Sequence, residues 1–482
     1  MKELHRLYPK LLFWSLVLLL LAPWAGAQTP GGDAQPAQSV APQEKKISPK
    51  EAEELFHDVD KILSFASKES ELPIKHEVKR RLVSRDEVVA YLEKNMAEDK
   101  DAQRLRRSEL VLKKFGLLPQ EFDLQAFLLA LLREQVAGYY DSKTKTVNLL
   151  DWLDAEQQRP VLAHELTHAL QDQSYDLEKW LKPDTDINDR KEPTAADIEE
   201  DEVTEARQAV IEGQAMVTLV DYMLEPTGQS LLGSPQIAKA LEEGMLVGTA
   251  DSVEFKNAPL FLKEAMTFPY RYGLDFEGEL LRSGGKQKAF VETLNHPPRN
   301  TRQIMEPKTY LSGERLEPLP LPDLDRDFKN YERFDIGAMG EFDVALLVDQ
   351  YAGVAASHDL YPHWRGGYYY AARPKGDPTA PLDVLYLSRW SDADSAAKFA
   401  GIYANALDKR YKHVHQVEQN ASTDVTQLPL HDTLTGTHTW LTEDGPVVIV
   451  VQAANVLVTE SFDQAMTERL EQELLGIAVS AK

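Results

Sequence analysis

The chain has 482 residues, of which 43% are hydrophobic and 27% are charged, and it contains no cysteine. This length suits two or three domains of a folded globular protein. The net charge of −25 argues against nucleic acid as a partner, and the lack of thiols excludes cysteine proteases, disulfides and thiolate metal sites. Any metal ligands must therefore be histidines and carboxylates.

Residues 1–27 have the features of a secretory signal peptide. Three basic residues precede an apolar run over residues 11–21, and Ala25-Gly26-Ala27 offers a small-residue cleavage site. We expect cleavage near Ala27 and a secreted or periplasmic protein with no membrane association afterwards. An uncleaved amino-terminal anchor is the alternative. Residues 28–47 are rich in Pro, Gly and Gln, which predicts a flexible linker.

Helical signals begin at Ser48-Pro49, where a capping serine and a proline are followed by Glu51. Further helices are predicted at 85–96, 102–115 and 122–136. We interpret this region as part of the domain that follows, with a removable pro-segment as the alternative. The stretches Ala137–Tyr140 and Thr146–Leu150 then flank the polar turn 141–144, which predicts a β-hairpin.

The next segment contains His164-Glu165-Leu166-Thr167-His168. Positions i and i+4 of a helix share a face, so the two imidazoles can bind one metal ion while Glu165 serves as a base. We expect Pro160 at the first helical position and a buried helix, because residues 161–170 are apolar nearly all round. Buried histidines are costly without partners, and one metal ion would serve both.

A catalytic zinc site usually has three protein ligands. A metzincin is excluded, because Gln171 and Ser174 stand where that pattern needs glycine and histidine. A glutamate from a second, antiparallel helix is the remaining common solution. We predict Glu212 as this ligand, since it lies in the apolar helical stretch 203–224, and Gly213 beside it would let the two metal-bearing helices approach closely.

Glu205 is predicted either to support the ligands or to be the alternative ligand. Glu202 and Glu205 also fit the solvated face of an acidic helix. The stretch 184–205 is dense in acidic residues, with only Arg190 and Lys191 as basic ones. We expect a mobile acidic loop between the two helices, with a lid or a calcium site as the less favoured alternatives.

The segment LAHELTHALQDQ, followed by Glu212-Gly213-Gln214-Ala215, resembles the predicted bacterial HExxH metallopeptidases of the gluzincin type. The resemblance covers roughly residues 120–325, including REQVAGYYDSKTKTVNLL and HPPRNTRQIMEPKTY. It implies one zinc ion with His164, His168 and Glu212 as ligands and Glu165 as the catalytic residue. In such peptidases an edge strand near the metal helix pairs with extended substrate, so the hairpin is the candidate here, with a purely structural role as the alternative.

The chain departs from the better-known gluzincin pattern at Met216, where an aspartate often supports a ligand histidine. Support must then come from elsewhere, and Glu205, Asp201 and Asp221 are the candidates. A donor to the developing oxyanion is also expected. The segment around residues 268–273 offers three side chains for this role, with packing as the alternative: Tyr270, Arg271 and Tyr272.

Residues 226–310 are predicted to be mostly helical, with a break at Pro297-Pro298. A proline-rich linker is expected over 315–330, followed by an α+β domain over 331–482. Its strands are predicted at 367–373, 382–389, 447–453 and 456–461, with helices at 392–410 and 464–475. We expect an antiparallel sheet, of ferredoxin-like topology, that supports the protein or positions substrate. The six histidines of this region are interpreted as scattered surface residues.

The sequence therefore predicts a mainly α, zincin-like metallopeptidase domain over 48–314 with a small β-hairpin or sheet, plus the α+β carboxy-terminal domain. The predicted function is an exported zinc-dependent metallopeptidase acting on a protein or peptide substrate. The alternatives are a catalytically silent metal-binding scaffold or substrate-binding protein, and a zinc amidase acting on cell-wall peptides. Cleavage specificity and oligomeric state have no signal in the sequence.

Overall fold

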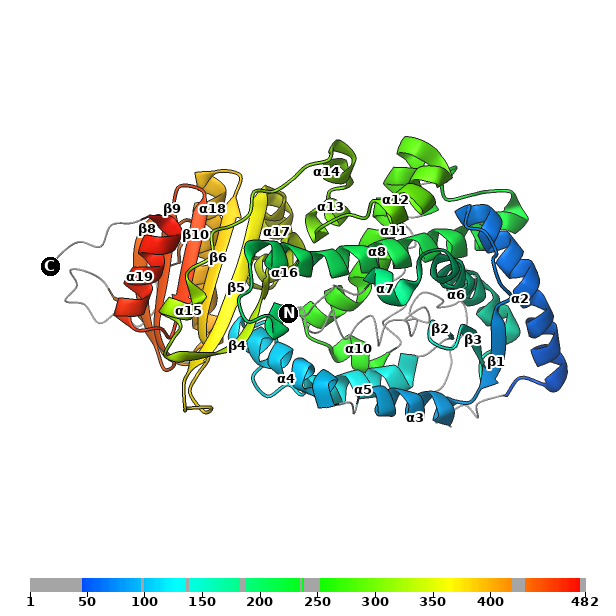
Figure 1. Cartoon of the computed structure of the whole chain (residues 1–482), viewed down its shortest axis with the longest axis horizontal. Coiled ribbons are helices and arrows are strands. Elements are labelled where there is room, and N and C mark those ends of the chain that lie inside the picture. Colours follow the sequence, from blue (N-terminus) through cyan, green and yellow to red (C-terminus); the bar gives the residue numbers. More distant parts are fainter. Residues whose placement is uncertain are drawn as a thin grey trace, which may run out of the picture.

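The computed structural model describes residues 46–96, 99–135, 138–181, 187–234, 236–237, 252–417 and 430–476. The predicted signal peptide and nearly all of the predicted linker 28–47 lie outside these residues. A helix-rich part, up to about residue 314, lies beside a part built on a seven-stranded sheet (Figure 1). The prediction of a mainly α part followed by an α+β part is confirmed at this level. Every described helix falls short of what a membrane span requires.

Four helices and a small sheet open the chain. The helices are α2 (Pro49–Ser70), which begins at the predicted capping box of Ser48 and Glu51, α3 (Arg85–Met96), α4 (Asp99–Lys114) and α5 (Leu124–Gln135). The predicted hairpin is confirmed as β2 (Tyr139–Asp141) and β3 (Thr146–Leu150), while Ala137 lies outside the described residues. A third strand, β1 (Lys79–Val83), pairs parallel with β3 and leaves β2 at one edge.

Three long helices form the centre of this part: α6 (Ala155–Tyr175), α8 (Ala195–Leu224) and α11 (Leu260–Lys286). The prediction that Pro160 begins the motif helix is wrong, because α6 begins at Ala155 and Pro160 lies inside it. A proline there leaves the carbonyl group four residues earlier, on Glu156, without a helical donor. Glu156 is exposed, so water can satisfy that carbonyl.

The predicted acidic loop is wrong for the second half of the stretch 184–205, because α8 begins at Ala195, after a capping box formed by Thr194 and Asp197. Residues 182–186 lie outside the described residues. The alternative that Glu202 and Glu205 lie on a solvated face is also wrong, since both are buried. Glu202 is buried because it accepts hydrogen bonds from the backbone N–H and the hydroxyl of Thr301.

The remaining helices of this part are short. They include a π-helical segment, η5 (Gln287–Glu292), that continues α11 after a non-helical residue at Gly285. The predicted break at Pro297-Pro298 lies between α12 and α13. The other short elements are α7 (Leu177–Leu181), η2 (Ile187–Asp189), η3 (Glu225–Thr227), α10 (Val253–Asn257), α12 (Thr293–Asn295), α13 (Thr301–Met305) and α14 (Pro307–Ser312). Helix α15 (Leu324–Asp327) follows beyond this part, before the first strand of the carboxy-terminal sheet.

The carboxy-terminal sheet has the order β4-β5-β6-β10-β9-β8-β7, and all neighbouring strands are antiparallel. The strands are β4 (Tyr331–Ala338), β5 (Trp364–Pro374), β6 (Asp383–Trp390), β7 (Val414–Gln416), β8 (Gly436–Thr442), β9 (Gly445–Gln452) and β10 (Asn455–Glu460). The ferredoxin-like expectation is wrong, because α16 (Glu341–Ala352), α17 (Val354–Leu360) and η6 (Tyr361–His363) join two adjacent antiparallel strands, whereas that topology requires a crossover between parallel strands.

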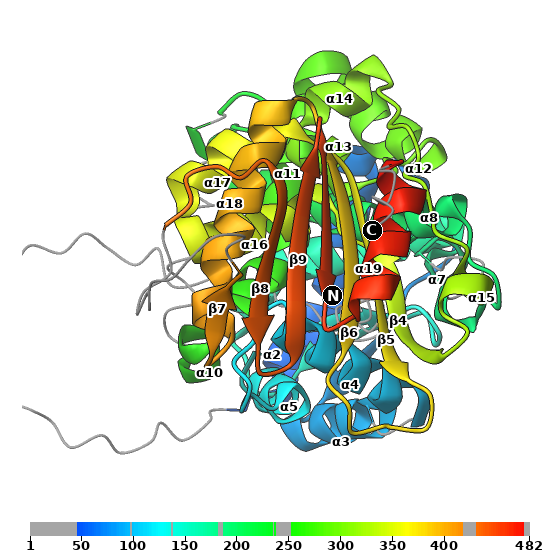
Figure 2. The same ribbon diagram turned by 90° about the vertical axis from the view of Figure 1, so that its left-hand side faces the viewer.

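Both faces of this sheet are covered (Figure 2). Along β5, Tyr369 points into the large core shared with the helix-rich part, while Tyr368 and Tyr370 point into a second core on the other face. Helix α18 (Ala393–Arg410) lies on the first face, and α19 (Gln464–Leu475) lies on the second. Strands buried on both faces lose the apolar and polar alternation of an exposed sheet.

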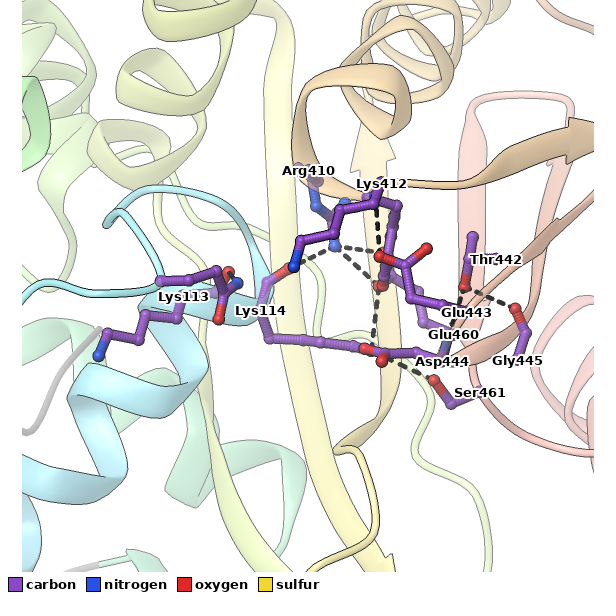
Figure 3. A network of polar contacts seen from close by, with 12 residues as sticks. Lys113, Lys114, Arg410, Lys412, Thr442, Glu443, Asp444, Gly445, Glu460 and Ser461 are labelled. Atoms are coloured by element: carbon purple, nitrogen blue, oxygen red, sulfur yellow. Dashed lines mark hydrogen bonds and ion pairs between the residues drawn. The ribbon is translucent and has the colours of Figure 1, made fainter.

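A buried ionic network joins the two parts (Figure 3). One guanidinium nitrogen of Arg410 lies 2.7 Å from both carboxylate oxygens of Glu460, which also accept hydrogen bonds from two tyrosine hydroxyls. Burial alone would raise the pKa of Glu460, but the charges of Arg410 and Lys114 outweigh it and hold that pKa below its usual value. Lys114, at the end of α4, also pairs with Asp444 at 2.9 Å.

Replacing Glu460 by Gln should therefore destabilise the protein strongly, because it leaves the buried charge of Arg410 without its partner. We expect a loss of about 3–5 kcal/mol in the free energy of unfolding, measured by urea denaturation. The exposed pair of Arg282 and Glu279 is the control. Glu279→Gln should cost less than about 1 kcal/mol. Equal effects of the two substitutions would contradict this role of the network.

The pH dependence of stability should contain a contribution from Asp383. Burial raises the pKa of this carboxyl to about 7, with Lys114 opposing and Asp463 adding to the shift. Between about pH 4 and pH 7 the folded chain holds a proton that the unfolded chain releases, so stability falls as the pH rises through this window. Asp383→Asn should raise the melting temperature at pH 8 more than at pH 5. Asp408 is exposed and serves as the control. Asp408→Asn should not raise the melting temperature more at pH 8 than at pH 5. Equal shifts of Asp383→Asn at both pH values would refute the assignment of this pH dependence to Asp383.

Candidate metal centre

Helix α6 places the imidazoles of His164 and His168 together in the core. The two residues are one turn apart on the same face, with 0% and 1% of their surfaces exposed. Their rings are perpendicular, their centroids are 4.6 Å apart, and their Nε2 atoms are 3.0 Å apart. Two nitrogen atoms at this distance need a proton or another cation between or beside them.

Helix α8 brings the carboxylate of Glu212 to the same point. One oxygen, Oε2, lies 3.1 Å from Nε2 of His164 and 3.4 Å from Nε2 of His168. Among the residues that the structure describes, these three form the one group of at least three histidine or acidic side chains whose ligand atoms converge. The group is buried and could hold a metal ion.

The charge states of these residues depend on each other. Burial lowers the pKa of His164 to about 4, so its ring is neutral. Burial also opposes charge on His168, but Glu212 and Glu165 outweigh it and raise its pKa to about 9. The two imidazoles likewise overcome the effect of burial on Glu212 and lower its pKa to about 2. The site therefore combines a carboxylate with one neutral ring, and metal binding would release the proton of the other.

Glu165 faces the edge strand β2. Its Oε2 accepts a hydrogen bond of 2.7 Å from the backbone N–H of Tyr140, which points away from β3. Burial raises the pKa of Glu165 to about 8, although this hydrogen bond lowers it. The structure therefore places the hairpin beside the motif, as its position in the sequence suggested.

Two glutamines support the candidate ligands. Nδ1 of His168 lies 2.9 Å from Oε1 of Gln171, and the side-chain amide of Gln208 donates to Oε1 of Glu212 at 2.8 Å. Both glutamines were missed as supporting residues. Their spacings, three residues after His168 and four before Glu212, are those of neighbours on a helix and could have indicated them.

Two of the three predicted supporting residues lie elsewhere. Asp201 accepts a hydrogen bond from the backbone of Ala338 in β4, and Asp221 accepts one from the backbone of Leu231. Both residues lie several turns away from Glu212 along α8, because a helix rises about 1.5 Å per residue. Each carboxylate therefore binds a backbone group far from the candidate ligands. Glu205 is buried about two turns before Glu212 and is not one of the three convergent residues.

Gly213 allows a close helix contact, but with a different partner from the one predicted. A Cβ atom on Gly213 would overlap the backbone of Gly273 in α11, and one on Gly273 would overlap the carbonyl group of Ala209 in α8. The close approach is therefore between α8 and α11, and not between α8 and α6. It holds α11 against the metal-bearing helix.

Of the three residues proposed as oxyanion donors, Tyr270 lies at the centre. Its ring is buried and stacks on that of His164, with centroids 6.2 Å apart. Arg271 instead pairs with Glu264 at 2.7 Å and lies over the ring of Tyr272. Tyr272 lies against Phe268 in the aromatic packing behind the site.

Comparison with known proteins adds no family assignment. No protein-family model matches the chain, and no curated protein or solved structure is significantly similar to it. What the site can do must therefore be argued from its own residues.

Substituting Gly213 by Ala should disturb both folding and metal binding, because the new methyl group meets backbone that cannot rotate away. We expect a loss of about 1–3 kcal/mol in stability and weaker metal binding. Gly278→Ala in α11 is the matched control, since its Cβ would meet only the end of Arg282. That change should be neutral or stabilising by up to about 1 kcal/mol. Thermal denaturation and metal titration of both variants test this.

Proposed function

We propose that this chain is an exported zinc-dependent metallopeptidase. The observation that carries the proposal is the convergence of two imidazoles and one carboxylate in a buried group, with a second carboxylate, Glu165, directly beside it. The predicted signal peptide supports a secreted or periplasmic location.

The spacing of the three atoms fits a tetrahedral ion. Bonds of ~2.0–2.1 Å to zinc at tetrahedral angles separate ligand atoms by roughly 3.3 Å. The separations among His164, His168 and Glu212 are 3.0, 3.1 and 3.4 Å. Two histidines and a carboxylate are also a ligand set that zinc favours and that leaves one position open. Three protein ligands are the number that catalytic zinc sites use, since these keep a fourth position for water.

When bound there, zinc would act as a Lewis acid that makes water nucleophilic near neutral pH and polarises a carbonyl group. The residues of the chain would handle the protons. Glu165, whose raised pKa the charge of the ion would lower, would accept the proton of the attacking water and deliver it to the leaving amine. Tyr270 is the candidate donor to the oxyanion, because it is the one residue of the three considered that contacts a ligand ring.

An extended polypeptide is the substrate that the surroundings favour. Edge strand β2 lies next to Glu165, at the position of a strand that could pair with a peptide backbone. The N–H of Tyr140 is engaged by Glu165, so its outward carbonyl group is the one that would meet the substrate. A zinc amidase acting on cell-wall peptides would use the same group. A silent metal-binding scaffold is less favoured, because a structural site needs no base beside it, whereas Glu165 is held there by Tyr140.

Removal of the metal should lower stability, because His164, His168 and Glu212 are buried together and bind an ion only in the folded protein. The purified mature chain should contain one zinc ion per molecule by mass spectrometry. Zinc at 100 times its dissociation constant should stabilise the fold by about 2.7 kcal/mol. Chelation should therefore lower the melting temperature, and His168→Ala should abolish that effect. A melting temperature insensitive to chelators would contradict the metal centre.

Replacing Glu165 by Gln should abolish peptidase activity while zinc binding persists. The amide keeps the shape of the side chain but cannot accept the proton. General acid and base catalysis contributes roughly 10²–10⁴-fold, so kcat/KM on casein or a fluorogenic peptide should fall by about this factor. His164→Ala, which should lose both zinc and activity, is the comparison. Full activity in Glu165→Gln would exclude the proposed role.

A further inference from the structure

Beyond the ligands, two buried glutamines form a chain of hydrogen bonds that begins at His168. Gln171 in α6 and Gln214 in α8 are both fully buried. Oε1 of Gln171 lies 2.9 Å from Nδ1 of His168. The amide nitrogen of Gln171 donates to Oε1 of Gln214 at 2.9 Å and to the carbonyl oxygen of Ile211 at 3.2 Å.

This chain of hydrogen bonds ends at the π-helical segment η5. The amide nitrogen of Gln214 donates to the carbonyl oxygen of Ala289 at 2.7 Å and to that of Phe290 at 3.3 Å. Both residues belong to η5, which follows the non-helical residue Gly285. A π-helical turn has altered backbone hydrogen bonding and often marks a functional site. Here it presents two carbonyl groups to one side chain of another helix.

Backbone carbonyl groups at two points fix the direction of these hydrogen bonds. Such groups only accept, so Gln214 must turn its amide nitrogen toward Ala289 and Phe290 and its oxygen toward Gln171. Gln171 likewise must turn its amide nitrogen toward Gln214 and the carbonyl group of Ile211, and its own oxygen toward His168. That oxygen can only accept, so Nδ1 of His168 carries the hydrogen, and Nε2 is the atom left for a metal.

We propose that the π-helical segment η5, together with the carbonyl group of Ile211, sets the orientation and tautomer of His168 through Gln214 and Gln171. This inference rests on the proposed metal centre and adds two positioning residues to it. Neither glutamine contacts the metal-binding point. Their function is to hold one ligand ring so that Nε2 faces His164 and Glu212.

Glu277 is a titratable group beside this chain of hydrogen bonds. It is fully buried in α11 near Gln214. Burial raises its pKa well above the usual value, and a side-chain hydrogen bond with Gln214 acts in the opposite direction. The direction of the hydrogen bonds rests on the backbone carbonyl groups that Gln214 and Gln171 contact.

The test compares zinc affinity in variants of the mature chain, measured by competition with a chromogenic chelator. Gln214→Met removes the link to η5 and should weaken zinc binding by about 10–100-fold. Gln303→Met is the matched control, because Gln303 is a buried glutamine in α13 that hydrogen-bonds to Glu314 and Arg299 away from the site. It should leave the affinity unchanged.

A rescue separates positioning from packing. In Gln214→Met, a second change of Gln171→Glu should recover most of the affinity, because both carboxylate oxygens accept and need no partner to orient them. Packing damage alone would not be repaired this way. Wild-type affinity in Gln214→Met, an equal loss in Gln303→Met, or no recovery in the double variant would each overturn the proposal.

A second measurement does not depend on zinc or on the folding of a variant. In the wild-type protein labelled with ¹⁵N-histidine, His168 should show an Nδ1–H proton that is protected from exchange with solvent, with and without zinc. An unprotected or absent Nδ1–H signal would refute the proposed chain of hydrogen bonds. A protected signal in a protein that binds no zinc would support that chain and refute the metal centre.

Discussion

The structure depends on the burial of two imidazoles and a carboxylate at one point between α6 and α8. Transfer of an ion from water to a protein interior costs several kcal/mol, so such groups are buried together only if they compensate one another or bind a cation. His164, His168 and Glu212 do so at 3.0 to 3.4 Å, in the buried core of the helix-rich part. A metal ion would satisfy all three ligand atoms at once.

Helix α8 connects this point to the rest of the molecule. Its first half is fixed to the carboxy-terminal part, because Asp201 accepts a hydrogen bond from the end of β4. Its second half carries Glu212 and is held against α11 by the contact of Gly213 with Gly273. The sheet-containing part therefore contacts the helix that carries one of the candidate ligands. The ionic network around Glu460 joins the same two parts at a second place.

Local sequence signals predicted the elements that depend on local chemistry. The capping box at Ser48, the hairpin around residues 139–150, strands β5, β6, β9 and β10 and helices α18 and α19 follow from spacing and turn residues. Strands β4, β7 and β8 and helices α16 and α17 were not predicted. Strand β1 was missed because its sequence, KRRLV, is basic and buries only its last residue. It forms only because β3 offers an edge, which is a tertiary effect.

In the candidate site too, local signals predicted some residues and tertiary contacts placed the others. The i and i+4 histidines and the glutamate within an apolar helix indicated the three convergent residues. The acidic residues before them were expected in solvent, because nothing local shows that Thr301 and Ala338 provide donors from far along the chain. The partner of Gly213 and the contact of Gln214 with η5 likewise depend on how three helices meet. Such contacts cannot be read from one segment alone.

X-ray absorption at the zinc edge of the purified mature protein tests the central claim most directly. The account predicts one zinc ion with two imidazole nitrogens at ~2.0–2.1 Å and oxygen atoms as the remaining ligands, and the loss of this signal in Glu212→Ala. A spectrum without histidine ligands, or one that is unchanged in Glu212→Ala, would contradict the assignment of this group as the metal centre.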